Sequence, residues 1–365
     1  MKGRKGSGST DGRRKKLLYL YPRSAVFIQR DIELLSRHYH VVTHELLKGS
    51  DLLLPFRLIG QFIFLIRHAA WKYDAVCHFS GYHSLLPALL ARRCFVILAG
   101  SDGACFPGFN YGNFRKSLYG KATGLSAKRA TRLLPVDATL IDAHQTYDPA
   151  SPVHQGIHAF VPDLYTPWTV VPYGFDVDHW KPVLGIDREE DLFVCVAGGA
   201  ASGNAVHYRK GIDLILQCAR DLPHARFTVV GSSRPHSYTD LPANVNVEGR
   251  MDPEGLRALF SKARYYMQVS VMEGFPNALC EAMLCNCIPI TSSMAAMPSI
   301  CGDVGFLCQR RDAKELGLVL AQALALPPSE RETRSHAARE RIASRFGEQE
   351  RERSLLQILD AFSTC

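Results

Sequence analysis

The sequence has no long, uninterrupted hydrophobic run. A helix that spans a membrane needs about 20 apolar residues, and residues 52–70, which come closest, are interrupted by Pro55 and Arg67. Residues 1–16 carry seven lysines and arginines but lack the apolar core and the small-residue cleavage pattern of a signal peptide. We therefore expect a cytoplasmic protein, with residues 1–15 as a disordered basic tail.

Paired cysteines are also lacking. The 11 cysteines are odd in number and scattered, and most lie within apolar runs, as reduced core cysteines do. Cys280, Cys285 and Cys287 cluster, but no C-x-x-C pair or nearby histidine accompanies them. Neither a disulfide framework nor a metal site is therefore expected.

Negative charge is scarce in the first half of the chain. Residues 1–182 contain 23 Lys and Arg against 13 Asp and Glu, a net charge of +10, whereas residues 183–365 contain 20 against 22, a net charge of −2. Part of the excess belongs to the basic tail. The rest indicates an anionic partner on that side, which could be a membrane surface, a lipid diphosphate or an acidic glycan. Peripheral contact with the inner face of a membrane therefore stays open, and no nucleic-acid partner is expected.

Strand-like runs alternate with helix-like runs, which is typical of parallel sheets covered by helices. Strands are predicted at residues 16–21, 41–43, 74–78, 95–99, 138–142, 192–197, 226–230, 245–248, 265–271 and 287–291. Helices are predicted at residues 27–37, 52–70, 84–92, 121–133, 212–220, 253–262, 331–345 and 349–362. A Pro- and Gly-containing linker at residues 182–190 separates two series. We therefore predict an α/β protein with doubly wound domains at residues 16–182 and 183–345, and a C-terminal helix within residues 346–365.

The most informative segment runs from Glu273 to Met283 and reads EGFPNALCEAM. It places a Gly-Pro turn between a strand and a helix, so that free backbone N–H groups and the helix dipole form an anion site. Two carboxylates, Glu273 and Glu281, are hydrogen-bond acceptors suited to hydroxyl groups. Phosphate and hydroxyl groups held side by side are what a nucleotide-sugar presents.

This segment resembles the nucleotide-sugar motif of retaining GT-B glycosyltransferases, family 4 (glycosyl transferases group 1) in particular. The resemblance implies two Rossmann-like domains facing across a cleft, with the final helix packing back on the first domain. It also implies that Glu273 lies by the sugar hydroxyls, that Glu281 takes the ribose hydroxyls, and that the amides of Gly274 and Phe275 orient the sugar. Pro276 and Asn277 complete the donor-binding motif.

A second element, Tyr208 to Asp213, resembles the family's K-G-x-D run, whose lysine binds the donor diphosphate. The resemblance makes Lys210 a catalytic candidate and Gly211 a donor-binding one. The family's usual arginine after the preceding strand is missing, so either Arg209 or the glycine-rich loop at residues 198–203 takes its place. Two further donor-side candidates follow strands of the second domain, Gly231 near the nucleoside and Arg250 near the base.

The first half resembles the family less closely. His83 is the catalytic candidate there, since family members place a histidine near the donor sugar, and His78 and Asp102 are acceptor-side candidates. Both histidines could equally be buried hydrogen-bonding groups, and Asp102 could equally form an Asp-Gly turn. Residues 22–27 replace the family's Gly-Gly loop with larger side chains, which should reshape the acceptor side.

We therefore predict a retaining hexosyltransferase that moves a sugar from a nucleoside diphosphate sugar to a hydroxyl of a glycan or lipid-linked acceptor, in cell-surface polysaccharide or glycolipid synthesis. No cofactor and no metal ion are expected, since cationic side chains and a helix end take the metal's role and no D-x-D signature is present. Two alternatives stay open. A nucleotide-sugar epimerase of similar fold would release a new sugar from donor alone, and a non-catalytic nucleotide- or polyanion-binding protein would bind without turnover.

Overall fold

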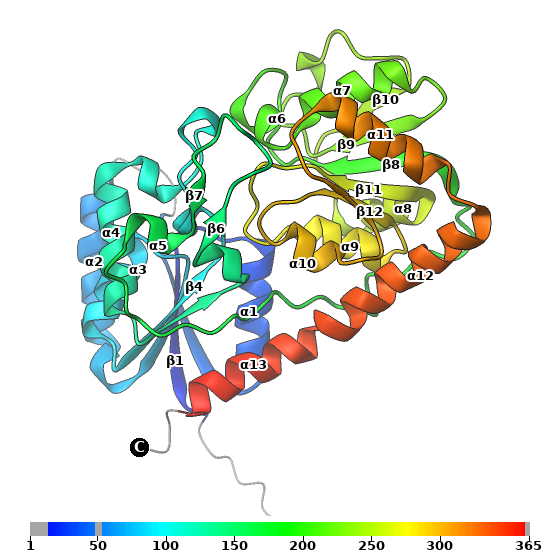
Figure 1. Ribbon diagram of the computed structural model, residues 1–365. Coiled ribbons are helices and arrows are strands. Elements are labelled where there is room, and N and C mark those ends of the chain that lie inside the picture. The colour runs from blue at the N-terminus through cyan, green and yellow to red at the C-terminus, as the bar shows by residue number, and fades with distance from the viewer. Residues whose placement is uncertain (1–13, 48–52, 362–365) are drawn as a thin grey trace, which may run out of the picture.

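The computed structural model describes residues 14–47 and 53–361, which form two lobes with one parallel sheet each (Figure 1). Most of the predicted basic tail, residues 1–13, lies outside the described residues, and so does Phe362 at the end of the last predicted helix. Among the described residues, no helix is long and apolar enough to cross a membrane.

The first lobe has a five-stranded sheet in the order β2-β1-β3-β4-β5. The strands are β1 (Lys16–Tyr21), β2 (His40–Glu45), β3 (Asp74–His78), β4 (Arg93–Leu98) and β5 (Arg132–Pro135). Its helices are α1 (Val26–Ser36), α2 (Leu54–Arg67), α3 (Tyr82–Leu90), α4 (Ser117–Arg129) and α5 (Ile157–Phe160), and a short antiparallel pair joins β6 (Ala143–His144) to β7 (His154–Gln155). Five of the six residues of β1 are buried, because helices cover both faces of a parallel sheet.

The second lobe has a six-stranded sheet in the order β10-β9-β8-β11-β12-β13. The strands are β8 (Glu189–Val196), β9 (Arg226–Val230), β10 (Val245–Val247), β11 (Ala263–Gln268), β12 (Ile288–Ser292) and β13 (Phe306–Cys308). The helices are α6 (Ala205–Arg209), α7 (Ile212–Asp221), α8 (Pro253–Lys262), α9 (Asn277–Leu284), α10 (Met297–Cys301), α11 (Ala313–Leu324) and α12 (Pro328–Arg345). The order reverses between β8 and β11, so loops that follow these two strands flank the crevice where ligands bind in doubly wound sheets.

The chain crosses between the lobes twice, and the two crossings lie against each other. Phe175 N donates to Phe346 O at 2.9 Å, and Glu348 N donates to Phe175 O at 3.1 Å. After the second crossing, α13 (Glu348–Ala361) lies across the first lobe (Figure 1). Buried Arg351 forms a two-pronged ion pair with buried Asp31 of α1, with N–O distances of 2.5 and 2.6 Å.

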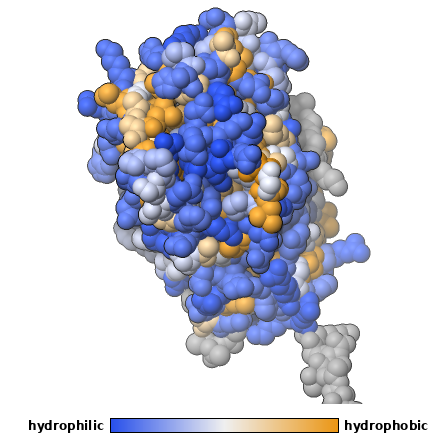
Figure 2. Space-filling view, turned by 90° about the vertical axis from the view of Figure 1, so that its right-hand side faces the viewer, coloured by the Kyte–Doolittle hydropathy of each residue, from blue (hydrophilic) through white to orange (hydrophobic). Residues whose placement is uncertain are grey.

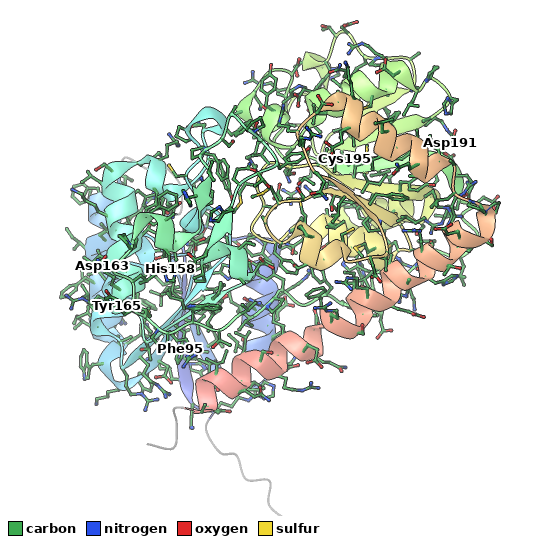
Figure 3. The ribbon with its side chains drawn as sticks, in the orientation of Figure 1. Phe95, His158, Asp163, Tyr165, Asp191 and Cys195 are labelled. Carbon is green, nitrogen blue, oxygen red and sulfur yellow. The ribbon has the colours of Figure 1, made fainter. Side chains whose placement is uncertain are left out.

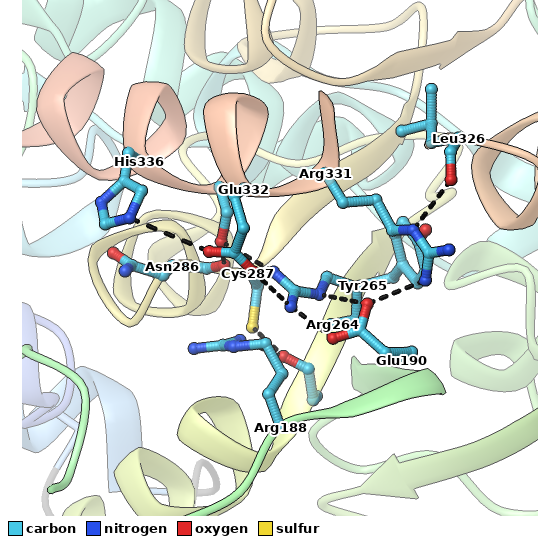
Figure 4. A network of polar contacts seen from close by, with 12 residues as sticks. Arg188, Glu190, Arg264, Tyr265, Asn286, Cys287, Leu326, Arg331, Glu332 and His336 are labelled. Carbon is cyan, nitrogen blue, oxygen red and sulfur yellow. Dashed lines mark hydrogen bonds and ion pairs between the residues drawn. The ribbon is translucent and has the colours of Figure 1, made fainter. Parts of the chain in front are cut away.

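A second ion-pair network fixes α12 to the amino-terminal ends of β8 and β11, the central strands of the second sheet (Figure 4). Buried Arg264 of β11 pairs with Glu190 of β8, and its Nη2 lies 2.7 Å from Glu332 Oε1 of α12. Arg331 Nη1 lies 2.8 Å from Glu190 Oε2. Burial disfavours the charge on Arg264, but the two carboxylates outweigh this and raise its pKa.

The alternation of strands and helices is confirmed, with one error in the first lobe. The predicted strand at residues 138–142 is instead a 3-10 turn, Ala138–Leu140, because the Asp137 side chain accepts from Thr139 N at 3.0 Å and caps it. The fifth strand is β5, where Thr131 N donates to Cys94 O at 2.7 Å and begins pairing with β4. The helix predicted at residues 121–133 therefore ends at Arg129.

Candidate active site

A cavity of ≈ 370 Å³ lies between the lobes at the carboxyl ends of the strands. The first lobe lines it with Phe27, Phe79, Ala99, Ser101, Tyr111 and Tyr173, and the second lobe with Val196, Gly198, Lys210, Gln268, Glu273, Gly274, Phe275, Pro276, Asn277 and Ala278. This volume falls within the range of small-molecule sites. Two of the three predicted catalytic residues, Lys210 and Glu273, therefore line one cavity.

The turn after β11 brings the two lobes into direct contact. A Cβ built on Gly274 would lie 1.8 Å from Ala99 O and 2.7 Å from Gly100 Cα of the first lobe. Only glycine permits this approach, since real Cβ atoms keep a much greater distance from backbone atoms. The turn therefore places Glu273, on its amino-terminal side, at the seam between the lobes.

Glu273 is held by two cations of the second lobe. Its Oε1 lies 2.7 Å from Lys210 Nζ and 3.4 Å from Arg209 Nη1. Burial raises the pKa of the Glu273 carboxyl, but the charges of Lys210 and Arg209 outweigh burial, so its pKa lies below the ordinary value. Glu273 is therefore a carboxylate, able only to accept hydrogen bonds, with the Lys210 ammonium group beside it.

Arg209 is fixed by a contact that the sequence does not reveal. Its guanidinium lies over the Tyr111 ring of the first lobe, 4.5 Å from the ring centre, and its Nη1 donates to Met272 O at 3.0 Å. Tyr111 belongs to a loop without a recognisable motif, so no pattern could have predicted this cation–π contact. Arg209 is near the cavity, but Lys210 rather than Arg209 lines it.

The glycine positions fit close backbone approach. Gly211 has φ +71° and begins α7, where a Cβ would lie 2.6 Å from Val269 O. Gly231 has φ +94° and packs on the glycine-rich loop, where a Cβ would lie 3.2 Å from Gly198 Cα. Gly199 and Gly203 also have positive φ and face open space. The loop after β8 thus presents backbone at the crevice without side chains in front of it.

Glu281 does not line the cavity. It lies on α9 and pairs with Arg30 of α1 across the lobes, with Arg30 Nη2 3.1 Å from Glu281 Oε1. Burial raises the pKa of Glu281 above its ordinary value, and Arg30 counteracts only part of that effect. Arg30 is a further partner that sequence reasoning missed, since α1 and α9 are about 250 residues apart along the chain.

The remaining donor-side candidates divide into two groups. Phe275, Pro276 and Asn277 line the cavity, with Pro276 immediately before the first helical residue, Asn277. The Asn277 side-chain oxygen is buried and has no hydrogen-bond partner, so it is open to a hydroxyl group. Arg250 is exposed and does not line the cavity. Gly231 does not line it either, and its N–H group donates to Glu248 O and Gly249 O, just before Arg250 in the chain.

The first-lobe candidates are all buried and occupied by protein groups. The His83 ring Nε2 contacts His78 O at 2.7 Å, and the His78 ring lies between Tyr19 and Tyr173, 2.8 Å from each hydroxyl. Asp102 accepts from the backbone N–H groups of Ser80, Ala99 and Gly100 at 2.9–3.0 Å. None of the three lines the cavity.

Burial also sets the protonation of these groups. It lowers the pKa of His78 to about 3 and that of His83 to about 4, so both rings are neutral. It raises the pKa of Asp102 to about 6, against the opposing effect of its backbone hydrogen bonds. The hydrogen bonds that Asp102 accepts from Ala99 N and Gly100 N shape the turn that meets Gly274, in agreement with the Asp-Gly turn considered for it above.

Solved structures define the class of this protein by its fold. Sucrose-phosphate synthase from Thermosynechococcus elongatus superimposes with a TM-score of 0.71 over 96% of this chain and 100% of that chain, at 16% identity. HepE from Anabaena in complex with UDP-glucose gives 0.68 over 95% and 100%, at 12% identity. WaaG, a glycosyltransferase involved in lipopolysaccharide biosynthesis, gives 0.65 over 94% and 99%, at 13% identity. The chain has the GT-B fold, two Rossmann-like domains that face each other.

The second lobe carries the more specific signal. Residues 199–325 match the family model described as Glycosyl transferases group 1. These residues include the cavity groups Lys210, Glu273 and Asn277. A comparison with curated proteins by sequence found no match. The chain thus has the GT-B fold, and residues 199–325 of its second lobe match the glycosyl transferases group 1 model.

Proposed function

We propose that this protein is a retaining, metal-independent glycosyltransferase of family 4, which moves a hexose from a nucleoside diphosphate sugar to a hydroxyl group of an acceptor. The observation that carries the proposal is the Lys210–Glu273 pair, 2.7 Å apart in the cavity between the lobes. The pair places a carboxylate, which accepts hydrogen bonds from hydroxyl groups, beside a cation that can bind phosphate. Both lie next to the amino-terminal end of α9. The matched family model and the fold support the same reaction class.

In the proposed complex, each group of the cavity has one task. The Glu273 carboxylate accepts hydrogen bonds from the sugar hydroxyls, and the buried oxygen of Asn277 accepts another. Lys210 turns from Glu273 to the diphosphate and stabilises the charge that develops on it as the glycosidic bond breaks. The open backbone of residues 198–203 and the Gly274 and Phe275 amides bind phosphate or sugar oxygens. Arg209 stays against the Tyr111 ring and helps to keep the Glu273 carboxyl ionised.

Retention of configuration is proposed from the family resemblance and from the ion pairing of Glu273. A carboxylate held by two cations is a weak nucleophile, so the acceptor hydroxyl attacks from the side that the diphosphate leaves, and a phosphate oxygen takes its proton. The neighbours support the substrate class. HepE was crystallised with UDP-glucose, and TarM of S. aureus with UDP and α-GlcNAc-glycerol. We propose a glycan or lipid-linked acceptor, in polysaccharide or glycolipid synthesis on the cytoplasmic face of a membrane.

Slow hydrolysis of a panel of nucleoside diphosphate sugars tests the proposal, because it needs no knowledge of the acceptor. The wild-type chain should release free nucleoside diphosphate from at least one donor, with the sugar's anomeric configuration retained when measured by NMR. Lys210→Ala should lower kcat/KM about 100-fold, the equivalent of one charge-assisted contact worth roughly 3 kcal/mol.

Lys314→Ala serves as the control, since Lys314 is an exposed lysine on α11 outside the cavity. Its donor turnover should match the wild type. Full turnover by Lys210→Ala would remove the phosphate role of Lys210. Release of a new, epimerised sugar by the wild type would favour an epimerase, and donor binding without turnover would favour a non-catalytic binding protein.

A further inference from the structure

Helix α2 presents its apolar side to solvent. Phe56, Ile59, Ile63 and Ile66 follow one another at helical spacing, and the first three have 72%, 57% and 58% of their surface exposed. Phe62 widens the stripe. A helix that faces water on its outer side normally shows the opposite pattern, so this stripe marks a binding surface.

The contacts on the inner side of α2 fix which face of the helix points outward. The fully buried residues of the helix are Gln61 and Leu65, and Gln61 Nε2 donates to His83 O at 2.8 Å. A polar side chain is thus satisfied inside the lobe while phenylalanine and isoleucine side chains remain outside. Turning the helix over would bury the stripe but would break this buried hydrogen bond.

The stretch of chain that contains α2, α3 and α4 is basic. Residues 53–135 contain 11 lysines and arginines against two acidic residues, Asp74 and Asp102. Asp74 is bound by Arg92 and Arg93, and Asp102 is buried. This stretch, which forms the layer of α2, α3 and α4 (Figure 1), therefore presents almost no negative charge to a partner.

Helix α4 repeats the combination of apolar and basic side chains. Its outer face alternates Leu118, Lys121, Leu125 and Lys128, all exposed. Lys128 pairs with Asp163 at 2.5 Å, and Asp163 lies on the nearby loop after α5 (Figure 3). The opposite side of the molecule differs, since Figure 2 shows a mainly hydrophilic face with small, separate hydrophobic patches.

A groove lies between the starts of α2 and α4. It has a volume of ≈ 520 Å³ and is lined by Leu46, Leu47, Leu54, Tyr82, Lys116 and Leu118, among others. Tyr82 lies three residues after Phe79, which lines the cavity between the lobes. The groove therefore begins at the start of α2, and along the chain its Tyr82 is three residues from the first-lobe side of the candidate active site.

We propose that the outer face of α2, with the groove and the outer face of α4, binds the surface of an anionic lipid bilayer. The α2 stripe lies in the interfacial region, and lysines of α4 meet lipid phosphates. With 14 residues, α2 is about 21 Å long, too short to span a bilayer but suited to lying in its surface. For the acceptor, which rests on the proposed function, this means a lipid-anchored molecule whose hydrocarbon chain enters the groove.

Vesicle co-sedimentation of the full chain tests the proposal. The protein should sediment with vesicles of mixed phosphatidylcholine and phosphatidylglycerol and should remain in solution with phosphatidylcholine alone. The bound fraction should fall as salt is added, because the charges lie at an exposed surface. The double variant Ile59→Glu, Ile63→Glu should weaken binding about tenfold or more, since it removes apolar contact and adds two like charges.

Two controls separate α2 from other causes. Leu318→Glu changes an apolar side chain of α11 with a similar exposure, 66%, and should bind vesicles as the wild type does. A variant with Lys2, Arg4 and Lys5 all changed to Gln tests the amino-terminal segment, and it should lose only a small part of the binding. Loss of all binding in that variant, with none lost in the α2 double variant, would overturn the proposal.

Further outcomes of these experiments separate the bilayer proposal from its alternatives. Equal binding to both kinds of vesicle would overturn the anionic part. Self-association that disappears in the α2 double variant, without vesicle binding by the wild type, would assign the stripe to a second copy of the chain. Donor hydrolysis without vesicles should be unchanged in the double variant. Vesicle binding by a chain that hydrolyses no donor would leave the docking surface intact and would overturn the proposed function instead.

Discussion

The residues of the candidate site divide into those whose chemistry faces the cavity and those whose chemistry is used up within the protein. Lys210, Glu273 and Asn277 belong to the first group. His78, His83 and Asp102 belong to the second, because backbone and tyrosine groups already satisfy them. The motif around Glu273 could be predicted because its order of strand, turn and helix is local. The partners Arg30 and Tyr111 could not, because their contacts depend on how two lobes meet.

The buried histidines predict a loss of stability in acid. The ordinary pKa of histidine is about 6.5, and burial lowers it to about 3 in His78 and about 4 in His83. Below pH 6.5 the unfolded chain therefore takes up protons that the folded chain does not, and the free energy of unfolding falls by at most about 1.4 kcal/mol per pH unit for each ring. Asp102 acts in the opposite direction between its pKa of about 6 and its ordinary value, since its folded form takes up a proton first.

Urea unfolding of His83→Gln at about pH 7.5 and about pH 5 isolates one ring. The variant should be less stable than the wild type at the higher pH, and it should lose less stability between the two. His236→Gln, at an exposed histidine, should keep the wild-type pH dependence. An unchanged pH dependence in His83→Gln would mean that His83 is not buried in its neutral form.

At the scale of elements, patterns of residues predict strands better than turns. The bounds of β1, β3, β9 and α8 agree with the expectation, because apolar runs there are flanked by charged or turn-forming residues. The segment at residues 138–142 has a strand-like composition, and only the side-chain cap of Asp137 turns it into a 3-10 turn. Short elements such as β13 and α10 were missed, since three to five residues contain too little periodicity.

A substitution at Gly60 tests the helical backbone of α2. Gly60 lies in the middle of the helix, and an added Cβ would meet nothing within 4 Å. Gly60→Ala should therefore raise the free energy of unfolding by about 0.5–1 kcal/mol, because alanine loses less backbone entropy in a helix. Thermal and urea unfolding measure the change.

Gly274→Ala is the matched comparison, since its Cβ would lie 1.8 Å from Ala99 O. It should lower stability or separate the lobes, and it should reduce donor hydrolysis. If both glycines responded alike, the close approach of the turn to the first lobe would be wrong.

At the scale of the molecule, the GT-B arrangement could be predicted, whereas the groups that hold the lobes together could not. Two α/β series and a linker are visible in the sequence, but nothing in it pairs Asp31 with Arg351, 320 residues further on. Their ion pair is buried together with Tyr19, which donates to Asp31 at 3.1 Å. It connects the last helix to the first lobe.

Arg351→Met should therefore cost about 3–5 kcal/mol in the free energy of unfolding, because it leaves the Asp31 charge buried without a partner. Arg353→Met, two positions along α13 and paired with Glu350 at the surface, should cost less than about 1 kcal/mol. Urea unfolding compares the two. The double variant Asp31→Leu, Arg351→Met should recover part of the loss, and equal costs at positions 351 and 353 would contradict a role for the buried pair.

The paired chain crossings at Phe175 and Gly347 restrict how the molecule can move. Because the two segments are hydrogen-bonded to each other, we expect them to act as a single hinge about which the second lobe rotates. The seam at Gly274 and Ala99 lies close to this hinge, since the neighbouring Phe275 ring centre lies 6.3 Å from that of Phe175 and 5.5 Å from that of Phe346. Under the proposed function, a rotation that breaks the seam would open the path by which a bulky donor enters the cavity. Product release would then require the loss of this seam and of side-chain contacts across the lobes such as Arg30 with Glu281 and Arg209 with Tyr111, and no unfolding.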